Sequence, residues 1–406
     1  MKKAILSWLL IFCLILPSLL VACDDVVTPE PENEPSEEVS DEAGESQDSD
    51  DQAQNPSDTT PEPEEIPFPR PSNVRTYTLT EETAGIKVLG ERRAKIDGCI
   101  TMDWTGSGIE FNAEVNIQST VSFTAKSTAP CYFKAYVDGD LWKNGESDYF
   151  TVGTTDTAVE LKDVPYGKHV IRLIKATGYT LALAQVSSVT LDGIISETAP
   201  AKNDLYIEFL GDSITCGWGI TGQFDGSYAS QDGTQAYPYR IAQRLGADYS
   251  ILGLSGCGVI VGGLNFDQNY LHTSPSRSTE DQYDFARKAD IVVINLGTNE
   301  QGTGASSSEF QAGYLRLLQN VFQKNGDDCV VYCLYGAMND AFSTQIKNAI
   351  NEYKQTHSDA KIHTLSLVRS TTPGGNPTWG HPGYGDNTKY VFALEAKLYE
   401  TYFKAE

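Results

Sequence analysis

The chain has 406 residues, which is too long for one ordinary domain and predicts two folded regions with unfolded sequence beside them. Its formal net charge of −25 is concentrated, because residues 24–72 hold 17 acidic side chains and a single basic one, Arg70. Without that segment and the basic start, 38 acidic and 27 basic residues leave a net charge of −11. The negative charge of this remaining sequence argues against nucleic acid as a partner, because nucleic-acid binding needs basic patches. The charge gives no evidence for or against binding of a neutral polysaccharide.

Residues 1–22 predict an export signal. The basic start Met1-Lys2-Lys3 precedes an apolar run over residues 4–19, and Leu20-Val21-Ala22 leads into Cys23. That order is typical of a secretory signal, and the small residues before Cys23 resemble the bacterial lipobox, in which the cysteine is lipidated after cleavage. The alternatives are a plain signal peptide or a membrane-spanning helix, but the run is short for a span. We expect an exported protein, lipid-anchored to the cell membrane or cell surface through Cys23.

Residues 23–72 predict a disordered acidic tether. They consist mainly of Pro, Glu, Asp, Ser and Gln with almost no aromatic side chains. Such a segment buries too little apolar surface to offset the entropy lost on folding. An acidic ligand-binding tail is the alternative, and nothing in the sequence favours it.

Residues 73–197 predict an antiparallel β-sandwich of the jelly-roll kind. Apolar and polar side chains alternate with period two in short runs, for example over residues 85–89, 108–112, 121–125, 132–137 and 169–174. Turn residues such as Asp138-Gly139-Asp140 and Lys143-Asn144-Gly145 separate the runs. Alternation with frequent turns is typical of antiparallel sheets, and no helix of normal length fits this region.

Residues 198–406 predict an α/β domain with a parallel sheet covered by helices in three layers. Aliphatic strands are expected over residues 205–210, 249–252, 291–296, 329–334 and 362–367, and helices over residues 237–245, 310–322, 344–353 and 390–403. Strands that are apolar throughout are buried on both faces. In such sheets the active site lies beyond the carboxyl ends of the strands.

Four loops at these strand ends carry the residues that acyl transfer needs. Ser213 follows the first strand and is a candidate nucleophile, and His381 lies between the last strand and the last helix as its base. The backbone N–H groups of Ser213 and Gly256 and the side chain of Asn299 are candidate oxyanion donors. Separately, Ser213 could be a helix cap and the others ordinary turn residues. Their joint order and placement favour the catalytic interpretation.

These four blocks resemble those of the SGNH (GDSL-type) hydrolases. The start Gly211-Asp212-Ser213-Ile214-Thr215-Cys216-Gly217 and the β-region motifs at residues 103–111 and 167–170 resemble carbohydrate esterase family 2 more narrowly. That family joins a jelly roll to an SGNH domain and deacetylates plant polysaccharides. The resemblance implies a carbohydrate O-acetyl esterase acting on xylan or glucomannan, with no metal or cofactor. Trp218 and Trp379 flank the site and are either core residues or substrate contacts.

Two positions depart from the family pattern. The superfamily usually places Asp three residues before the histidine, where this chain has Thr378. Asn376 and Asp386 lie near His381 in the sequence, but nothing else suggests that either replaces the missing Asp. A Ser-His dyad, as in several family members, is therefore expected. The third block ends in Glu300, at a position where the superfamily commonly has Asp. This difference leaves the supporting role of that position open and does not affect the chemistry itself. A non-catalytic glycan-binding lipoprotein and a short-chain lipid esterase are the alternative functions.

The cysteines beyond Cys23 match no zinc pattern. Cys329 and Cys333 lie four residues apart in a predicted strand, about 13 Å between Cα atoms, which is too far for a disulfide. Cys216 and Cys257 lie beside two of the motifs and are interpreted as buried thiols, with a disulfide between them as the alternative.

Overall fold

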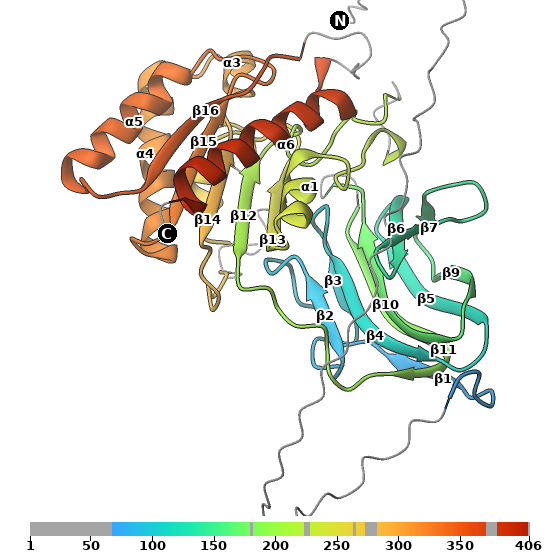
Figure 1. Ribbon diagram of the computed structural model, residues 1–406. Helices are drawn as coiled ribbons and strands as arrows, with labels where there is room; N and C mark the ends of the chain where they lie inside the picture. The colour runs from blue at the N-terminus through green and yellow to red at the C-terminus, as the bar shows by residue number, and fades with distance from the viewer. Residues whose placement is uncertain are drawn as a thin grey trace, which may run out of the picture. The chain divides into compact units, whose positions relative to one another are not determined.

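The computed structural model describes residues 67–178, 182–222, 228–262, 265–272, 282–370 and 380–404 (Figure 1). Residues Glu64–Glu406 form one compact unit. The predicted signal, Cys23 and nearly all of the predicted tether lie outside the described residues, as do Thr378 and Trp379. Within the described ranges, no helix has the length and hydropathy needed to cross a membrane.

The N-terminal region consists of strands that pair antiparallel throughout. The main path of the sheet runs β7-β6-β10-β4-β11-β5-β9, and the other strands pair with its members. The bounds are β1 (Val74–Thr78), β2 (Ile86–Leu89), β3 (Ile100–Met102), β4 (Gly108–Val115), β5 (Ser119–Ser127), β6 (Cys131–Val137), β7 (Asp140–Trp142), β8 (Phe150–Val152), β9 (Thr157–Val164), β10 (Gly167–Lys175) and β11 (Ala184–Ile195). The prediction of antiparallel strands is confirmed, whereas the jelly-roll assignment stays a prediction.

The alternation read from the sequence separates the core face from the solvent face of these strands. In β5, Val121, Phe123 and Ala125 are buried, while the residues between them are partly exposed. The turn between β6 and β7 is formed by Asp138 and Gly139, both at positive φ, which matches the twist that a two-residue hairpin requires. These local features explain why the strand prediction succeeded.

The C-terminal region contains a parallel sheet with strand order β13-β12-β14-β15-β16. Its strands are β12 (Tyr206–Gly211), β13 (Asp248–Gly253), β14 (Ile291–Asn295), β15 (Val330–Tyr335) and β16 (Ile362–Ser366). The helices are η1 (Tyr228–Ser230), α1 (Tyr237–Arg244), α2 (Phe266–Asn269), α3 (Glu300–Thr303), α4 (Ser307–Asn325), α5 (Ser343–Thr356), α6 (Tyr384–Leu398) and the π-helical turn η3 (Tyr399–Phe403). The predicted α/β order is confirmed, although α6 begins six residues before the predicted helix.

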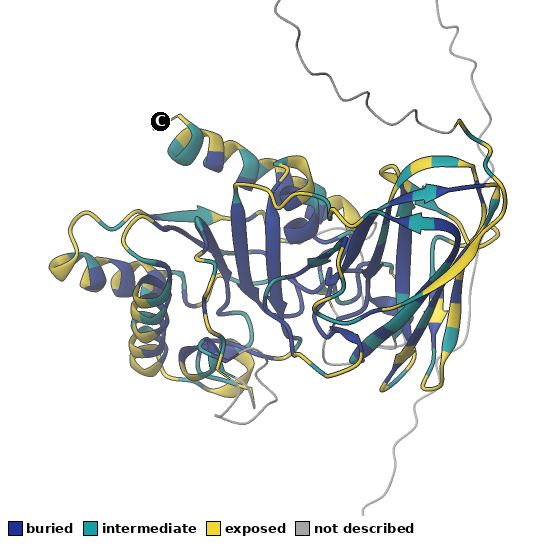
Figure 2. Ribbon diagram, turned by 90° about the horizontal axis from the view of Figure 1, so that it is seen from below, coloured by how far each residue is buried: buried dark blue, intermediate teal, exposed yellow. Residues whose placement is uncertain are grey.

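Alternate residues of β12 belong to two different apolar clusters. Ile207 and Phe209 share a cluster with residues of α1 and α6, whereas Tyr206 and Leu210 share one with residues of α4 and α5. Strands β12, β13 and β14 are buried along their length, whereas β16 at the edge of the sheet is mostly intermediate (Figure 2). The three-layer label itself stays a prediction. Because β12 lies between β13 and β14, the chain turns in opposite directions on its two sides, and this switch point favours a site beyond the end of β12.

The segment between β3 and β4 joins the antiparallel strands to the parallel sheet. Trp104 is 2% exposed and belongs to the apolar cluster of the C-terminal sheet rather than to that of the N-terminal strands. Gly106, at φ +76°, accepts a hydrogen bond at its carbonyl from the Tyr249 hydroxyl at 2.8 Å. A Cβ on Gly233 would lie 1.8 Å from Thr105 Oγ1. The two regions therefore share one continuous packed interior along this segment.

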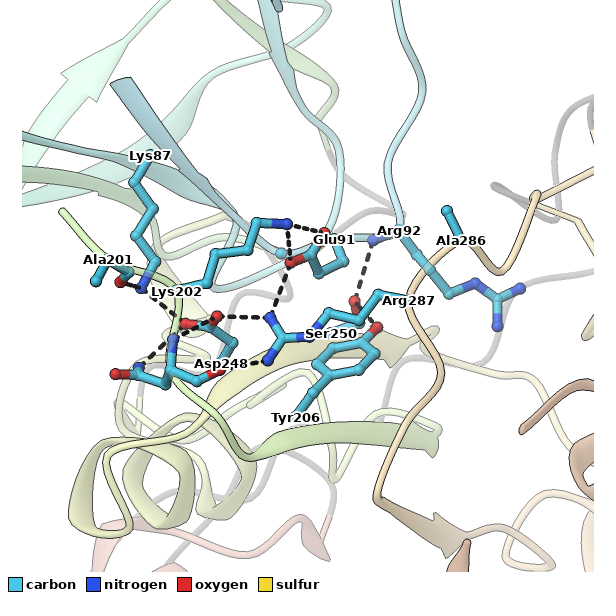
Figure 3. A network of polar contacts seen from close by, with 12 residues as sticks. Lys87, Glu91, Arg92, Ala201, Lys202, Tyr206, Asp248, Ser250, Ala286 and Arg287 are labelled. Carbon is cyan, nitrogen blue, oxygen red and sulfur yellow. Dashed lines mark hydrogen bonds and ion pairs between the residues drawn. The ribbon is translucent and has the colours of Figure 1, made fainter. Parts of the chain in front are cut away.

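Ion pairs reinforce the same junction (Figure 3). Asp248 lies between Lys87 and Arg287, at 2.8 and 2.6 Å. Glu91 pairs with Arg287 at 3.2 Å and with Lys202 at 2.9 Å. These contacts link β2 and the residues after it to β13 and the residues before β14.

A buried pair lies deeper in the junction. Arg92 Nη1 contacts Glu208 Oε1 at 2.9 Å, and both side chains are almost fully buried. The Tyr270 hydroxyl donates to the other Glu208 oxygen at 2.7 Å, and Arg92 Nη2 donates to the carbonyl of His272 at 2.6 Å. Because buried charges are tolerated only with such partners, Arg92 and Glu208 depend on each other.

Candidate active site

Ser213 lies in a tight turn directly after β12. A Cβ on Gly211 would lie 1.9 Å from Thr215 Oγ1, so only glycine allows the chain to fold back so closely here. The backbone N–H groups of Thr215 and Cys216 donate to the carbonyl of Asp212 at 3.1 and 3.2 Å. Residues 213–221 form successive turns. The backbone donors near Ser213 therefore come from a turn and not from a helix N-terminus.

His381 meets Ser213 across 168 residues of sequence. Its Nε2 lies 2.8 Å from Ser213 Oγ, the distance at which an imidazole accepts a hydroxyl proton. The buried side chain of Asn387 in α6 donates to the carbonyls of Pro382 and Gly383 at 3.2 and 3.0 Å. Its Oδ1 accepts from the backbone N–H of Tyr237 at 3.0 Å, which ties this loop to α1. No pattern in the sequence singles out Asn387.

Gly256 and Gly258 meet two different requirements in the loop after β13. Gly256 has φ +80°, a conformation that favours glycine, and a Cβ there would meet no atom within 4 Å. A Cβ on Gly258 would lie 2.2 Å from Glu300 Oε1, so this position requires the absence of a side chain. Within the described residues, the backbone N–H groups of Ser213 and Gly256 donate to no protein acceptor.

The side chain of Asn299 lies between the first two loops. Its Nδ2 donates to the carbonyl of Cys257 at 2.6 Å and lies 3.4 Å from Asp212 Oδ2. The first contact is short and fixes the amide, whereas the second is long and easily exchanged for another acceptor. Asn299 therefore contacts Asp212, which directly precedes Ser213, and the loop that carries Gly256, while His381 contacts Ser213 itself.

Two buried carboxylates support these loops. Burial raises the pKa of Asp212 to about 7, and the nearby charge of Glu300 adds to this effect. Glu300 is itself buried, which raises its pKa, and its Oε1 accepts from the backbone N–H groups of Val259 and Ile260 at 2.5 and 3.2 Å. Glu300 therefore holds the loop that follows Gly256, a role the sequence signalled only by a charged residue directly after Asn299.

A family comparison fits this geometry. Residues 209–389 match the model of the GDSL-like lipase/acylhydrolase family. This part of the chain is a GDSL-like hydrolase domain. Families of this kind hydrolyse carboxylic esters, so the match agrees with the nucleophile and base that the geometry brings together.

Individual relatives extend the likeness to the strands before the hydrolase domain. The chain is 28% identical over 312 residues to the cellulase/esterase CelE of Acetivibrio thermocellus, covering 73% of this chain and 37% of that protein. It is 26% identical to a family two carbohydrate esterase from Clostridium thermocellum solved with cellohexaose, with TM-score 0.68 and coverage of 77% and 98%. An acetyl xylan esterase from Butyrivibrio proteoclasticus, at 18% identity and TM-score 0.70 over 80% and 97% of the chains, shares the fold.

The chain covers different fractions of the length of its curated relatives. The chain spans 37% of the first and 61% of the second, an acetylxylan esterase / glucomannan deacetylase of Cellvibrio japonicus that is 24% identical over half of this chain. The resemblance to family 2 carbohydrate esterases thus covers both regions of the fold described above.

The remaining predicted residues have mixed outcomes. Trp218 is half-buried and its backbone N–H donates to the carbonyl of Ser213 at 2.9 Å, while its contact with substrate stays a prediction. Trp379, Thr378 and Asn376 lie outside the described residues. Asp386, in the first turn of α6, accepts a hydrogen bond from Ser370 Oγ at 2.7 Å.

The cysteines of the described region remain thiols. Cys216 and Cys257 are both buried and form no disulfide, as the sequence favoured, and burial raises the pKa of Cys216 to about 12. Cys329 and Cys333 are unbridged as well. Among the described residues, no group of three or more His, Cys, Asp or Glu side chains is arranged to hold a metal ion.

Proposed function

We propose that the protein is a carbohydrate O-acetyl esterase in which Ser213 is the nucleophile and His381 the general base. The observation that carries the proposal is the 2.8 Å contact between His381 Nε2 and Ser213 Oγ at the end of β12. A serine hydroxyl is nearly inert at neutral pH, and an adjacent imidazole activates it by accepting its proton during attack.

The reaction would take place in two halves. Ser213 Oγ bonds to the acetyl carbon while its proton moves to His381, and the carbonyl oxygen becomes an oxyanion. The backbone N–H groups of Ser213 and Gly256 and the Asn299 amide would donate to that oxyanion, the last by exchanging its 3.4 Å contact with Asp212. The intermediate collapses, the sugar oxygen takes the proton from His381, and acetyl-serine remains. A water molecule, deprotonated by His381, then releases acetate by the same route.

The relatives support the choice of substrate. Two of them are named acetylxylan esterase / glucomannan deacetylase, and a structure similar to this chain was solved with cellohexaose. We infer that this chain removes acetyl groups from plant polysaccharides of the xylan or glucomannan type. A sugar deacetylase should strongly prefer the acetyl group, so comparing acetyl with longer acyl esters separates it from a lipid esterase.

Ser213→Ala tests the proposal. The variant should lose release of acetate from 4-nitrophenyl acetate and acetylated xylan by at least about 10³-fold, because no other group replaces the nucleophile. Ser358→Ala, in an exposed turn, is the matched control and should retain full activity. Full activity of Ser213→Ala, with an unchanged melting temperature, would refute the mechanism. Labelling of Ser213 by a serine-directed phosphonate separates an esterase from a glycan-binding protein that has lost catalysis.

We further propose that the protein is exported and lipid-anchored to the cell membrane or cell surface through Cys23. The support is the order of charge, apolar run and small residues in the first 22 positions. The acidic segment that follows would act as a tether between the lipid and the folded unit. Metabolic labelling with palmitate should mark the wild-type protein and not Cys23→Ala, and equal labelling of both would contradict the anchor.

A further inference from the structure

A groove lies on the β-region, between the strands at the two ends of the main sheet path. It has a volume of about 690 Å³, which is in the range of small-molecule and oligosaccharide sites. Its lining includes Trp142 at the end of β7, Lys143 and Asn144 directly after it, and Glu160, Lys162 and Asp163 from β9. Figure 1 shows the β7 hairpin beside β6. None of these residues belongs to the catalytic turn or to the loops that support it.

Trp142 provides a fixed aromatic surface in this groove. The indole is half-buried and packs against the apolar core of the β-region. Its Nε1 donates to the carbonyl of Lys162 at 3.2 Å, so the ring bridges from β7 to β9. Because one edge packs on the core and the N–H is already bonded, the ring is held before a ligand arrives. A rigid aromatic side chain loses little conformational entropy on binding.

The other lining side chains are polar, exposed and balanced in charge. Lys143 and Lys162 carry positive charges, Glu160 and Asp163 carry negative ones, and Asn144 is neutral. Asp163 has φ +61° at a break in the pairing register between β5 and β9, a bulge that re-aims side chains locally. A groove with no net charge is poorly suited to nucleic acid or an acidic peptide, whereas these donors and acceptors suit the hydroxyl groups of a neutral sugar.

The loop at one wall of the groove is tied to the catalytic turn. After Asn144 the chain reaches Tyr149, whose hydroxyl donates to Asp232 Oδ2 at 2.7 Å. The backbone N–H of Asp232 in turn donates to the carbonyl of Gly217, four residues beyond Ser213, at 3.3 Å. The groove and the catalytic turn are therefore parts of one connected structure.

We propose that this groove is a second carbohydrate-binding site, which holds a neutral polysaccharide with one sugar ring stacked on Trp142. The sugar class rests on the proposed function, whereas the groove itself rests on Trp142 and its polar surroundings. Holding a polymer at this site raises the local concentration of its acetyl groups at Ser213 without changing the chemical step. Small soluble esters gain nothing from the groove, because they cannot reach both sites.

Hydrogen exchange with acetylated glucomannan hexasaccharide tests the site in the Ser213→Ala protein, which cannot consume the ligand. We expect protection of the backbone at residues 142–145 and 160–163, and its loss in Ser213→Ala/Trp142→Ala. Tyr399→Ala, which removes an exposed aromatic ring elsewhere, is the matched control and should keep the protection. Protection confined to residues 254–262, or unchanged protection in the Trp142→Ala protein, would overturn the proposal.

Kinetics separate the groove from the proposed function. With Ser213 present, Trp142→Ala should raise the KM for acetylated glucomannan about tenfold and leave the rate on 4-nitrophenyl acetate unchanged, both measured well below the melting temperature of either protein. Unchanged KM for the polymer would contradict the groove and leave the esterase intact. If the wild-type protein released no acetate but the Trp142-dependent protection persisted, the esterase function would fail and the groove would stand.

Discussion

Replacing Glu300 with alanine tests how firmly the loop that carries Gly256 is held. The substitution removes the acceptor that fixes the backbone N–H groups of Val259 and Ile260 at 2.5 and 3.2 Å. Val259 is fully buried and Ile260 is half-buried, so water can replace the lost acceptor only at Ile260. A buried donor without a partner costs about 1–3 kcal/mol, and the loop is expected to move in order to avoid that cost.

Movement of this loop should be visible mainly in kcat. The loop touches Glu300 at Gly258, and Gly256 lies two residues before that contact. A shift of the loop at Gly258 would therefore also move the backbone N–H of Gly256 away from the oxyanion. Loss of one oxyanion donor reduces the rate by about 10²–10³-fold, because that contact strengthens in the transition state. We expect Glu300→Ala to lower kcat by roughly 10²-fold with KM changed by less than about threefold.

Steady-state kinetics on 4-nitrophenyl acetate measure both constants, and Glu300→Gln is the matched control. Glutamine retains an oxygen that accepts from the same two N–H groups, so kcat should stay within about tenfold of the wild type. Gly258→Ala pushes the loop from the opposite side and should resemble Glu300→Ala. An equal loss of kcat in the alanine and glutamine variants would refute the positioning role, because the charge and not the acceptor would then be responsible.

Two further predictions concern stability. Arg92→Ala leaves the Glu208 carboxylate buried without its partner and should lower the free energy of unfolding by about 3–5 kcal/mol, measured with urea, whereas Arg92→Met/Glu208→Met should lose less. A similar loss in both proteins would contradict the mutual dependence. Burial raises the pKa of Asp103 to about 6, so its contribution to stability is full below pH ~4 and is lost as the pH rises through about 6. Asp103→Asn should therefore flatten the pH dependence of unfolding between pH 4 and 6, by on the order of 3 kcal/mol; an unchanged slope would contradict this assignment.

The sequence indicated the candidate site because its residues follow strand ends. The aliphatic runs before Ser213, Gly256 and Asn299 are strong local patterns, and parallel topology brings their carboxyl ends together without knowledge of any side-chain contact. Asn387 and Trp104 could not be found this way. Tyr237, through which Asn387 is tied to α1, lies 150 residues away from it, and the cluster partners of Trp104 lie about 100 or more residues away. Neither helical nor strand periodicity carries information about such pairs.

The elements that the sequence did not indicate have a similar cause. The residues after Ser213 satisfy their backbone groups in successive turns, which leave no periodic pattern in the sequence. Strands β7 and β8 have three residues each and are too short for an alternating pattern to be recognised. The groove on the β-region was missed for the same reason, since Trp142 ends one of these short strands.

The position of Trp104 has a consequence for the order in which the molecule can be completed. Its apolar cluster includes Phe310 and Tyr314 of α4, which are synthesised about 200 residues later. At the usual speed of translation this interval is roughly 10–40 s, during which the indole has no finished interior to enter. During this interval the nascent β-strands therefore leave the large apolar side chain of Trp104 exposed. A protein cut between β11 and β12 would make that temporary state permanent, so the isolated β-region is expected to aggregate.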